Sequence, residues 1–126
     1  MVYFFCKKNK KKNGRIVNWA IRNKEGKLIG VIGFDDGLDG HKAEIGYWLA
    51  KPYWGKGIMT AAVEKVCEIG FKEFGLRRIT ANVFEQNIAS ARVVEKCDFN
   101  LESACLKNYY KKDSKIFNGK LYAKTI

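Results

Sequence analysis

Apolar residues recur along the chain with two different periods, and the change between them falls near the middle. Over residues 43–50, "AEIGYWLA", every second residue shares one face, which is the period of a β-strand. From about residue 57 to residue 74 the apolar positions recur at intervals of three and four, the period of an α-helix with a wide apolar face. The middle of the chain therefore predicts a strand that turns directly into a helix.

The same two periods predict the other elements, in the order β-β-β-α-β-α-β-β. Further strands are expected at 16–21, 27–34, 77–85, about 100–110 and 117–125, and a second helix at 88–97. Between these segments, a turn is expected at 23–26, a polar loop at 35–42 and a polar turn around 111–115. Gly75 and Asn87 stand in the positions of helix caps. This order predicts an α+β fold, in which helices pack against a sheet.

Length and composition indicate a single domain of residues 1–126. Of the 126 residues, 47% are hydrophobic and 29% are charged, as in an ordinary globular domain. No apolar run approaches the roughly 20 residues that span a bilayer. The net charge of +11 includes a cluster of cations at residues 7–15, for which a solvated basic arm is the simplest interpretation. Attraction to a nucleic acid or to an anionic cofactor would explain the same charge.

The cysteines and the single histidine, His41, do not form a metal-binding pattern. Cys6, Cys67, Cys97 and Cys105 lack the close spacing of metal ligands. Cys67 lies on the apolar side of the long helix and is expected to be a small core residue. At the N-terminus the apolar residues precede the lysines, the reverse of a secretory signal. We therefore predict no metal, four free thiols and a cytoplasmic location.

The segment Lys-Pro-Tyr-Trp-Gly-Lys-Gly, residues 51–57, joins the strand to the long helix. Gly55 and Gly57 remove side chains there, which gives a ligand room to approach the backbone. The first helical turn carries unpaired N–H groups and the positive end of the helix dipole, and Lys51 and Lys56 add positive charge. These features favour a phosphate or pyrophosphate group. The segment matches neither the Rossmann nor the Walker A pattern, so a tight connection without a ligand is the alternative.

Two segments together resemble a known superfamily. They are "AEIGYWLAKPYWGKGIMTAAV" at 43–63 and "LRRITANVFEQNIASARVVEKCDF" at 76–99, and they resemble the GNAT acetyltransferases, more narrowly the RimJ/RimL branch of ribosomal-protein N-terminal acetyltransferases. The resemblance implies a mixed, mostly antiparallel sheet flanked by helices, shortened at the N-terminus by the family's usual first strand and first helices. It also implies that acetyl coenzyme A is the co-substrate and that a primary amine, with a protein N-terminal α-amine preferred, accepts the acetyl group.

Carried over residue by residue, the resemblance implies a cofactor site at the glycine turn and on the second helix. Its residues are Trp54, Gly55, Lys56, Gly57, Ile58, Met59 and Thr60 at the turn, and Asn87 and Ser90 on the helix. Three positions depart from the family pattern. Met59 replaces a small residue, Val94 replaces a tyrosine that protonates the departing thiolate, and Asp98 replaces a glycine. We expect Met59 to crowd the pyrophosphate or tilt the start of the helix, and Asp98 to strain the end of the second helix.

The implied chemistry needs a base and a polarised carbonyl group. Glu44 is the candidate base, because it lies on the strand face opposite Tyr47; a salt-bridged or exposed carboxylate is the alternative. The backbone N–H groups of Leu49 and Ala50, at the splayed end of this strand, are expected to polarise the thioester carbonyl.

An acid is needed as well, to protonate the thiolate that leaves. Ser90 is one candidate, although a hydrogen bond to the cofactor is its simpler role, and Tyr109 and Tyr110 are substitutes whose simpler role is packing. A second hypothesis is a protein that binds coenzyme A with little transfer. The expected partners are acetyl coenzyme A and an amine such as a ribosomal-protein N-terminus. We expect no contact with a membrane, and contact with nucleic acid only through association with the ribosome. A homodimer remains an open alternative.

Overall fold

The protein folds around one seven-stranded sheet with the strand order β1-β2-β3-β4-β5-β7-β6. The computed structural model describes the backbone of residues 2–11 and 14–126, and the side chains of residues 17–34 and 40–126. The strands are β1 (Val2–Lys11), β2 (Gly14–Asn23), β3 (Leu28–Asp39), β4 (Lys42–Leu49), β5 (Arg78–Phe84), β6 (Asn100–Lys112) and β7 (Lys115–Thr125). The helices are α1 (Ile58–Glu73), α2 (Ile88–Lys96) and the short 3-10 helix η1 (Lys51–Tyr53). The predicted α+β fold with a mostly antiparallel sheet is confirmed.

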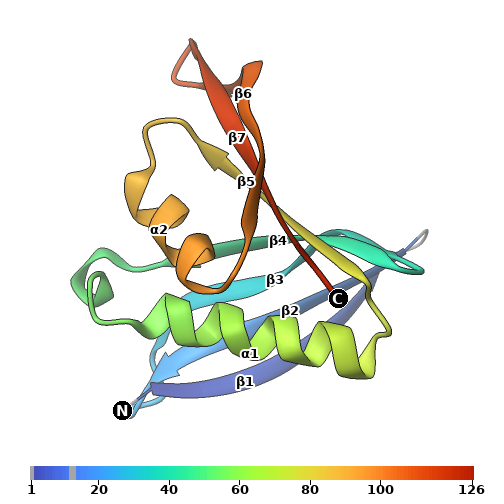
Figure 1. Cartoon of the computed structure of the whole chain (residues 1–126). Coiled ribbons are helices and arrows are strands. Elements are labelled where there is room, and N and C mark those ends of the chain that lie inside the picture. Colours follow the sequence, from blue (N-terminus) through green and yellow to red (C-terminus); the bar gives the residue numbers. More distant parts are fainter. Residues whose placement is uncertain (1, 12–13) are drawn as a thin grey trace.

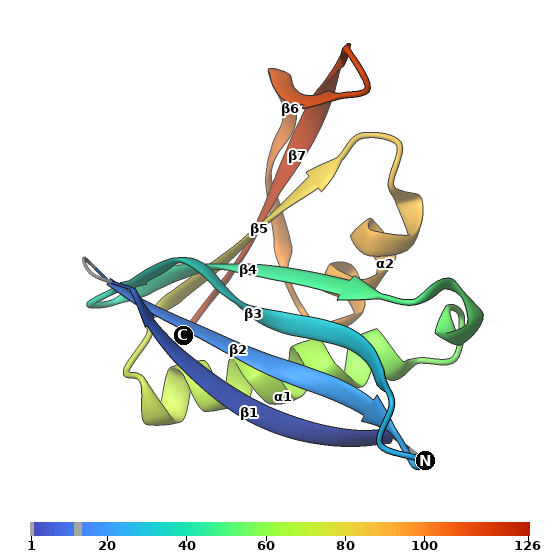
Figure 2. The same cartoon turned by 180° about the vertical axis from the view of Figure 1, so that it is seen from behind.

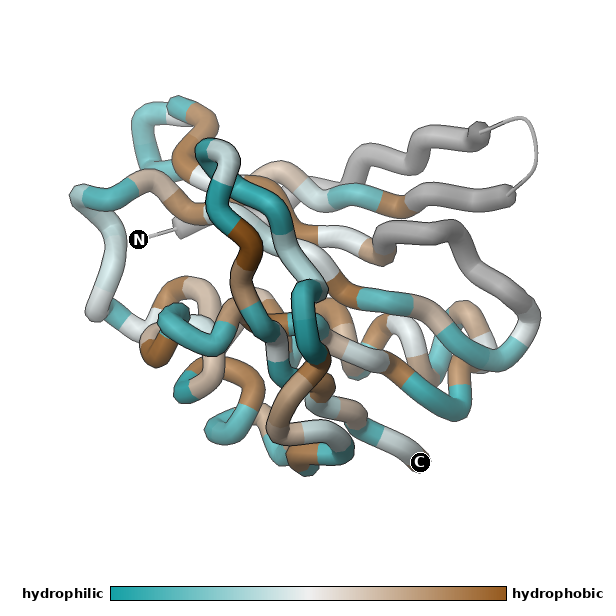
Figure 3. The backbone as a smooth tube through the Cα atoms, turned by 90° about the horizontal axis from the view of Figure 1, so that it is seen from above, coloured by the Kyte–Doolittle hydropathy of each residue, from teal (hydrophilic) through white to brown (hydrophobic). Residues whose placement is uncertain are grey.

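Helix α1 covers one face of the sheet and closes the hydrophobic core (Figures 1 and 2). Hydrophobic and hydrophilic segments are interspersed along the backbone (Figure 3), and on α1 the buried residues recur every three or four positions, as expected for a helix with one buried face. Its residues Val63 and Val66 are fully buried, as are Ile32 and Ile79 on the strands that α1 covers. Helix α2 packs beside α1, where the Cys97 thiol donates a hydrogen bond to the Thr60 carbonyl at 3.4 Å.

Among the strands that the structure describes, β4 and β5 are the only parallel neighbours, and the sheet opens between them. These strands pair over three positions, from Lys42↔Arg78 to Glu44↔Thr80. Beyond them β4 continues along β3 as far as Leu49, while β5 continues along β7 as far as Phe84. The pairing therefore ends at Glu44, and beyond it β4 and β5 diverge (Figure 1) and leave an opening in the sheet.

Two predicted boundaries are wrong, and a third is displaced by two residues. Residues 2–11, which include much of the predicted basic arm, form strand β1, paired antiparallel with β2. The predicted loop at 35–42 is mostly strand, because β3 runs to Asp39 and β4 begins at Lys42, with an irregularity in their pairing. The predicted polar turn around 111–115 is present as a two-residue turn at Asp113 and Ser114, both with positive φ, and each flanking strand extends two residues further toward it than predicted. In each case backbone pairing extends through polar residues, which the hydrophobic pattern does not mark.

Candidate functional site

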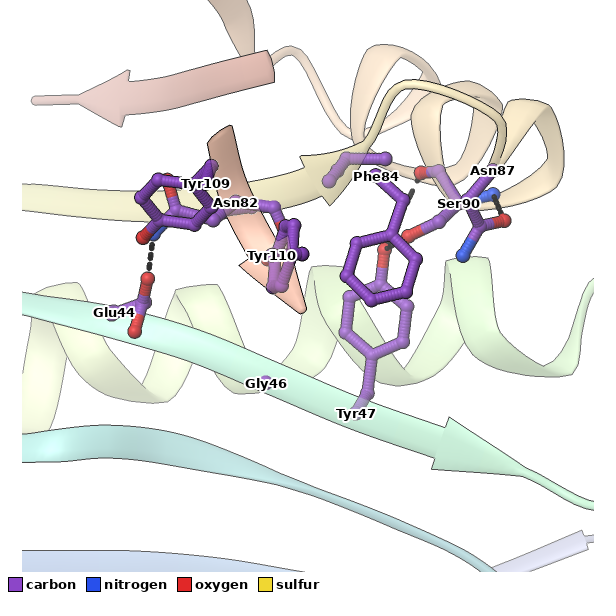
Figure 4. Close-up of a pocket in the computed structure, with 11 residues that line it drawn as sticks. Glu44, Gly46, Tyr47, Asn82, Phe84, Asn87, Ser90, Tyr109 and Tyr110 are labelled. Atoms are coloured by element: carbon purple, nitrogen blue, oxygen red, sulfur yellow. Dashed lines mark hydrogen bonds between the residues drawn. The ribbon is translucent and has the colours of Figure 1, made fainter. Parts of the chain in front are cut away.

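A cavity of about 430 Å³ occupies the opening between β4 and β5 (Figure 4). Its lining includes Glu44, Gly46 and Tyr47 from β4, Asn82 and Phe84 from β5, Asn87 and Ser90 around the start of α2, and Tyr109 and Tyr110 from β6. Glu44 and Tyr47 point to opposite faces of β4, because side chains alternate along a strand. The cavity thus has lining residues from both faces of the sheet, with Glu44 and Asn82 at one end and Tyr47 and Ser90 at the other.

The end on the sheet face opposite α1 holds a carboxylate in a fixed place. The Asn82 amide donates a hydrogen bond to Glu44 Oε1, and Tyr110 Oη donates one to the Asn82 carbonyl at 3.0 Å. Burial raises the pKa of Tyr110 to about 12, with smaller contributions from Tyr109 and Glu44. Tyr110 therefore keeps its proton at neutral pH and remains a hydrogen-bond donor. The half-buried Glu44 carboxylate lines the cavity, in a position to accept a proton from a bound molecule.

The other end of the cavity holds two hydroxyl groups in contact. Tyr47 Oη lies 2.6 Å from Ser90 Oγ, and either atom can be the donor. The Asn87 side chain accepts a hydrogen bond from the Ser90 N–H at 3.1 Å and so caps α2, as predicted. Burial raises the pKa of Tyr47, which its hydrogen bond to Ser90 partly offsets. No local pattern in the sequence indicates this contact between Tyr47 and a serine 43 residues away.

The predicted glycine turn is present and leaves the start of α1 open. Gly55 and Gly57 have φ values of 73° and 75°, which favour glycine, and a Cβ on either residue would meet no atom within 4 Å. Gly57 is the N-cap of α1 and supplies no side chain to bond the first N–H groups. The amides of Ile58, Met59 and Thr60 therefore form a donor cluster at the positive end of the helix dipole, suited to a phosphate group.

Side chains anchor this turn to the rest of the sheet. The Trp54 indole N–H donates a hydrogen bond to the Leu49 carbonyl at 2.6 Å, while the ring remains 59% exposed. Tyr53 Oη accepts a hydrogen bond from the Asn23 amide at 3.1 Å. The exposed Lys56 ammonium lies 5.7 Å from the centre of the Tyr53 ring. The hydrogen bonds of Trp54 and Tyr53 thus hold the turn against the sheet, and Lys56 supplies a positive charge within the turn.

Two expectations about this region change with the structure. The Ala50 N–H donates to the Ile29 carbonyl at 2.8 Å inside the sheet, so it is already bonded. Since N–H groups alternate in direction along a strand, the Leu49 N–H points to the opening instead. Met59 is 7% exposed and its side chain packs in the core, so it does not crowd the outer side of the turn.

The other two departures from the family pattern, Val94 and Asp98, lie near the end of α2. Val94 is fully buried and lies outside the lining of the cavity. Asp98 has a φ of 66°, in the left-handed region where glycine is preferred, which confirms the predicted strain. The Phe99 N–H then donates to the Val94 carbonyl at 3.0 Å and closes the helix.

The described cysteines are free thiols. Cys67 and Cys97 are buried and Cys105 is exposed, while the side chain of Cys6 lies outside the described residues. Burial raises the pKa of Cys67 to about 12 and that of Cys97 to about 11. Within the part of the chain whose side chains are described, no cluster of residues could hold a metal ion, and no helix is long and apolar enough to cross a membrane.

Comparison with known proteins places this geometry in a family. The family described as "Acetyltransferase (GNAT) domain" matches residues 2–100. The chain is 34% identical to an N-acetyltransferase of Bacillus subtilis (strain 168), YoaA, over 98% of this chain and 69% of the relative.

Solved structures of acetyltransferases also resemble this chain. The ribosomal-protein-S5-alanine acetyltransferase of Vibrio fischeri superposes with a TM-score of 0.83 and 29% identity, over 87% of this chain and 61% of that one. RimL, a ribosomal L7/L12 α-N-protein acetyltransferase in complex with coenzyme A, superposes with a TM-score of 0.80 and 25% identity, over 88% and 62%. The chain thus spans about three fifths of the length of these solved structures.

Proposed function

The chain belongs to the GNAT acetyltransferase family, and from this premise we propose that it transfers the acetyl group of acetyl coenzyme A to the α-amine of a protein N-terminus. The observation that carries the proposal is the cavity in the opening between β4 and β5, which has a carboxylate at one end and paired hydroxyl groups at the other. An acyl donor that enters from the sheet face covered by α1 and an amine that enters from the opposite face would meet in this cavity.

The cofactor is proposed to bind from the glycine turn along the open edge of β4. Its pyrophosphate would accept hydrogen bonds from the amides of Ile58, Met59 and Thr60, with Lys56 supplying positive charge within the turn. From Leu49 back to Glu44 the strand runs five residues, about 17 Å, a distance that suits the long pantetheine arm. Asn87 and Ser90 face this path from α2.

In the reaction, the neutral amine attacks the thioester carbonyl carbon, and the carbon–sulfur bond breaks. The Leu49 N–H would polarise the carbonyl oxygen. Glu44, held by the Asn82 amide, would take the proton released from the amine nitrogen, directly or through water. Ser90 would give a proton to the departing sulfur, with its hydroxyl oriented by Tyr47. An α-amine with a pKa near 8 needs less help from a base than a lysine near 10.4.

The competing hypothesis is a protein that binds coenzyme A with little transfer. Met59 does not favour it, because the Met59 side chain packs in the core and not at the proposed pyrophosphate position. Both hypotheses share the glycine turn, so only the acceptor side distinguishes them.

The experiment is a thiol-release assay with acetyl coenzyme A and short peptides that lack lysine. We expect acetylation of a peptide that has a free α-amine, with the acetyl group located at the N-terminus by tandem mass spectrometry. We expect no acetylation of the same peptide when its N-terminus is blocked. A polyamine is the second acceptor. Product with the polyamine alone would contradict the N-terminal assignment. Coenzyme A binding with no product from any amine would favour the binding-only hypothesis.

A further inference from the structure

We propose that the β6–β7 hairpin selects acceptor chains that carry acidic residues about six or seven positions after the acetylated amine. The inference rests on the proposed function, since it describes the peptide that enters the same cavity. The hairpin projects from the sheet beside α2 (Figure 1), and its residues Tyr109 and Tyr110 form part of the cavity wall. We therefore place a chain whose amine lies at Glu44 along this hairpin as it leaves the cavity.

Strand register places a continuous row of side chains on the outer sheet face. Phe84 pairs with Gly119, and Phe117 lies two residues before Gly119, so Phe84 and Phe117 share a face. Tyr110 pairs with Phe117 and belongs to the same face. Ring contacts agree, because Phe84 lies 3.8 Å from Tyr110 and 6.3 Å from Phe117 between centroids. Asn82, two residues before Phe84, joins the row to the carboxylate of Glu44.

The row ends in lysines at the tip of the hairpin. Lys112 pairs with Lys115, each two residues beyond the Tyr110 and Phe117 pair, so both point to the aromatic face. Residues 107–120 contain five lysines against one aspartate. Among the residues with described side chains, none of these lysines forms an ion pair. A concentration of unpaired positive charge beside a cavity attracts an acidic partner and speeds its encounter.

The length of the row fixes the position of the acidic residues. Asn82 pairs with Leu121, and the strand takes six residue steps from Leu121 to Lys115. At about 3.4 Å per residue this is roughly 20 Å, the length of six residues of an extended peptide. Its first residues would lie over the ring cluster of Phe84, Tyr110 and Phe117, and its sixth and seventh would reach the lysines. We infer an acidic peptide rather than RNA because the row begins at the half-buried carboxylate of Glu44 and leads through aromatic side chains into the cavity.

The test compares peptide acceptors that differ only at positions six and seven, with two glutamates or two glutamines there. We expect kcat/KM to be about tenfold higher for the acidic peptide, the sum of two exposed charge pairs. Moving the two glutamates to positions two and three should remove the advantage. The preference should also shrink as salt is raised, since the Debye length falls from about 10 Å at 0.1 M to about 3 Å at 1 M.

Variants assign the preference to the hairpin. Lys112→Glu/Lys115→Glu should lose the advantage of the acidic peptide and keep activity on the neutral one. Lys24→Glu/Lys27→Glu, in the exposed β2–β3 turn, makes the same change in net charge and should leave the preference intact. Coenzyme A affinity should be equal in the unmodified protein and in both double variants, and this equality also shows that the variants fold.

The outcomes separate this inference from the proposed function. Equal kcat/KM for acidic and neutral peptides would overturn the hairpin's role and leave N-terminal acetylation standing. Absence of any peptide acetylation would overturn both. A single-stranded RNA is the second probe, measured by fluorescence anisotropy. RNA binding that Lys112→Glu/Lys115→Glu abolishes, together with no peptide preference, would assign the lysines to nucleic acid and contradict the proposal.

Discussion

Replacing Glu44 with glutamine removes the proposed base and leaves the shape of the cavity. Glutamine keeps the Oε1 atom to which the Asn82 amide donates, so the side chain stays in place. A positioned base contributes about 10²- to 10⁴-fold to rate. At pH 7 about a tenth of an α-amine with a pKa near 8 is already neutral, so the lower figure applies. We expect kcat to fall about 10²-fold, equivalent to about 2.7 kcal/mol in the barrier.

The assay is thiol release at saturating acetyl coenzyme A, measured from pH 7 to pH 9. The loss should shrink as pH rises, because the amine then arrives neutral, and calorimetry should show unchanged coenzyme A affinity. Glu102→Gln is the matched control: this carboxylate is bonded to Arg78 outside the cavity and should leave kcat unchanged. Full activity of Glu44→Gln near pH 7 would remove Glu44 from the mechanism.

Three further predictions test the cofactor turn, the thiols and the strained helix end. Gly57→Asp should abolish calorimetric binding of acetyl coenzyme A, because a carboxylate at the start of α1 repels the pyrophosphate; undiminished binding would contradict the placement. Of the three described cysteines, only Cys105 should react with iodoacetamide at pH 8 in the native protein, because Cys67 and Cys97 are buried and their raised pKa values keep them as thiols; all should react after denaturation without reductant. Asp98→Gly should raise the free energy of unfolding by about 1 kcal/mol in urea titrations, since glycine accepts a φ of 66° without strain, and a decrease would refute this reading of the cap.

The features that could be predicted from the sequence are those encoded locally. The turn at Gly55 and Gly57 lies within a few residues, and so does the Asn87 cap of α2. The hydrophobic periods also place α1 and most strands, because one buried face repeats along each element. The family resemblance then supplied the chemistry for which Glu44 and Ser90 are candidates.

The features that sequence reasoning missed depend on contacts between distant residues. The Asn82 amide lies 38 residues from Glu44, and Tyr47 lies 43 from Ser90. Both contacts follow from the short parallel pairing of β4 with β5, whose register no local pattern reveals. The bonding of the Ala50 N–H to Ile29 depends on pairing between β3 and β4 in the same way.

Calorimetric titration with a bisubstrate conjugate tests the central claim most directly. The conjugate joins coenzyme A through an acetyl bridge to the N-terminus of a peptide, so that its two halves occupy the cofactor path and the acceptor end of one cavity. The account predicts that it binds at least about 10²-fold more tightly than coenzyme A alone, because the second contact becomes intramolecular. Equal affinity for the conjugate and for coenzyme A would contradict a meeting of cofactor and acceptor between β4 and β5.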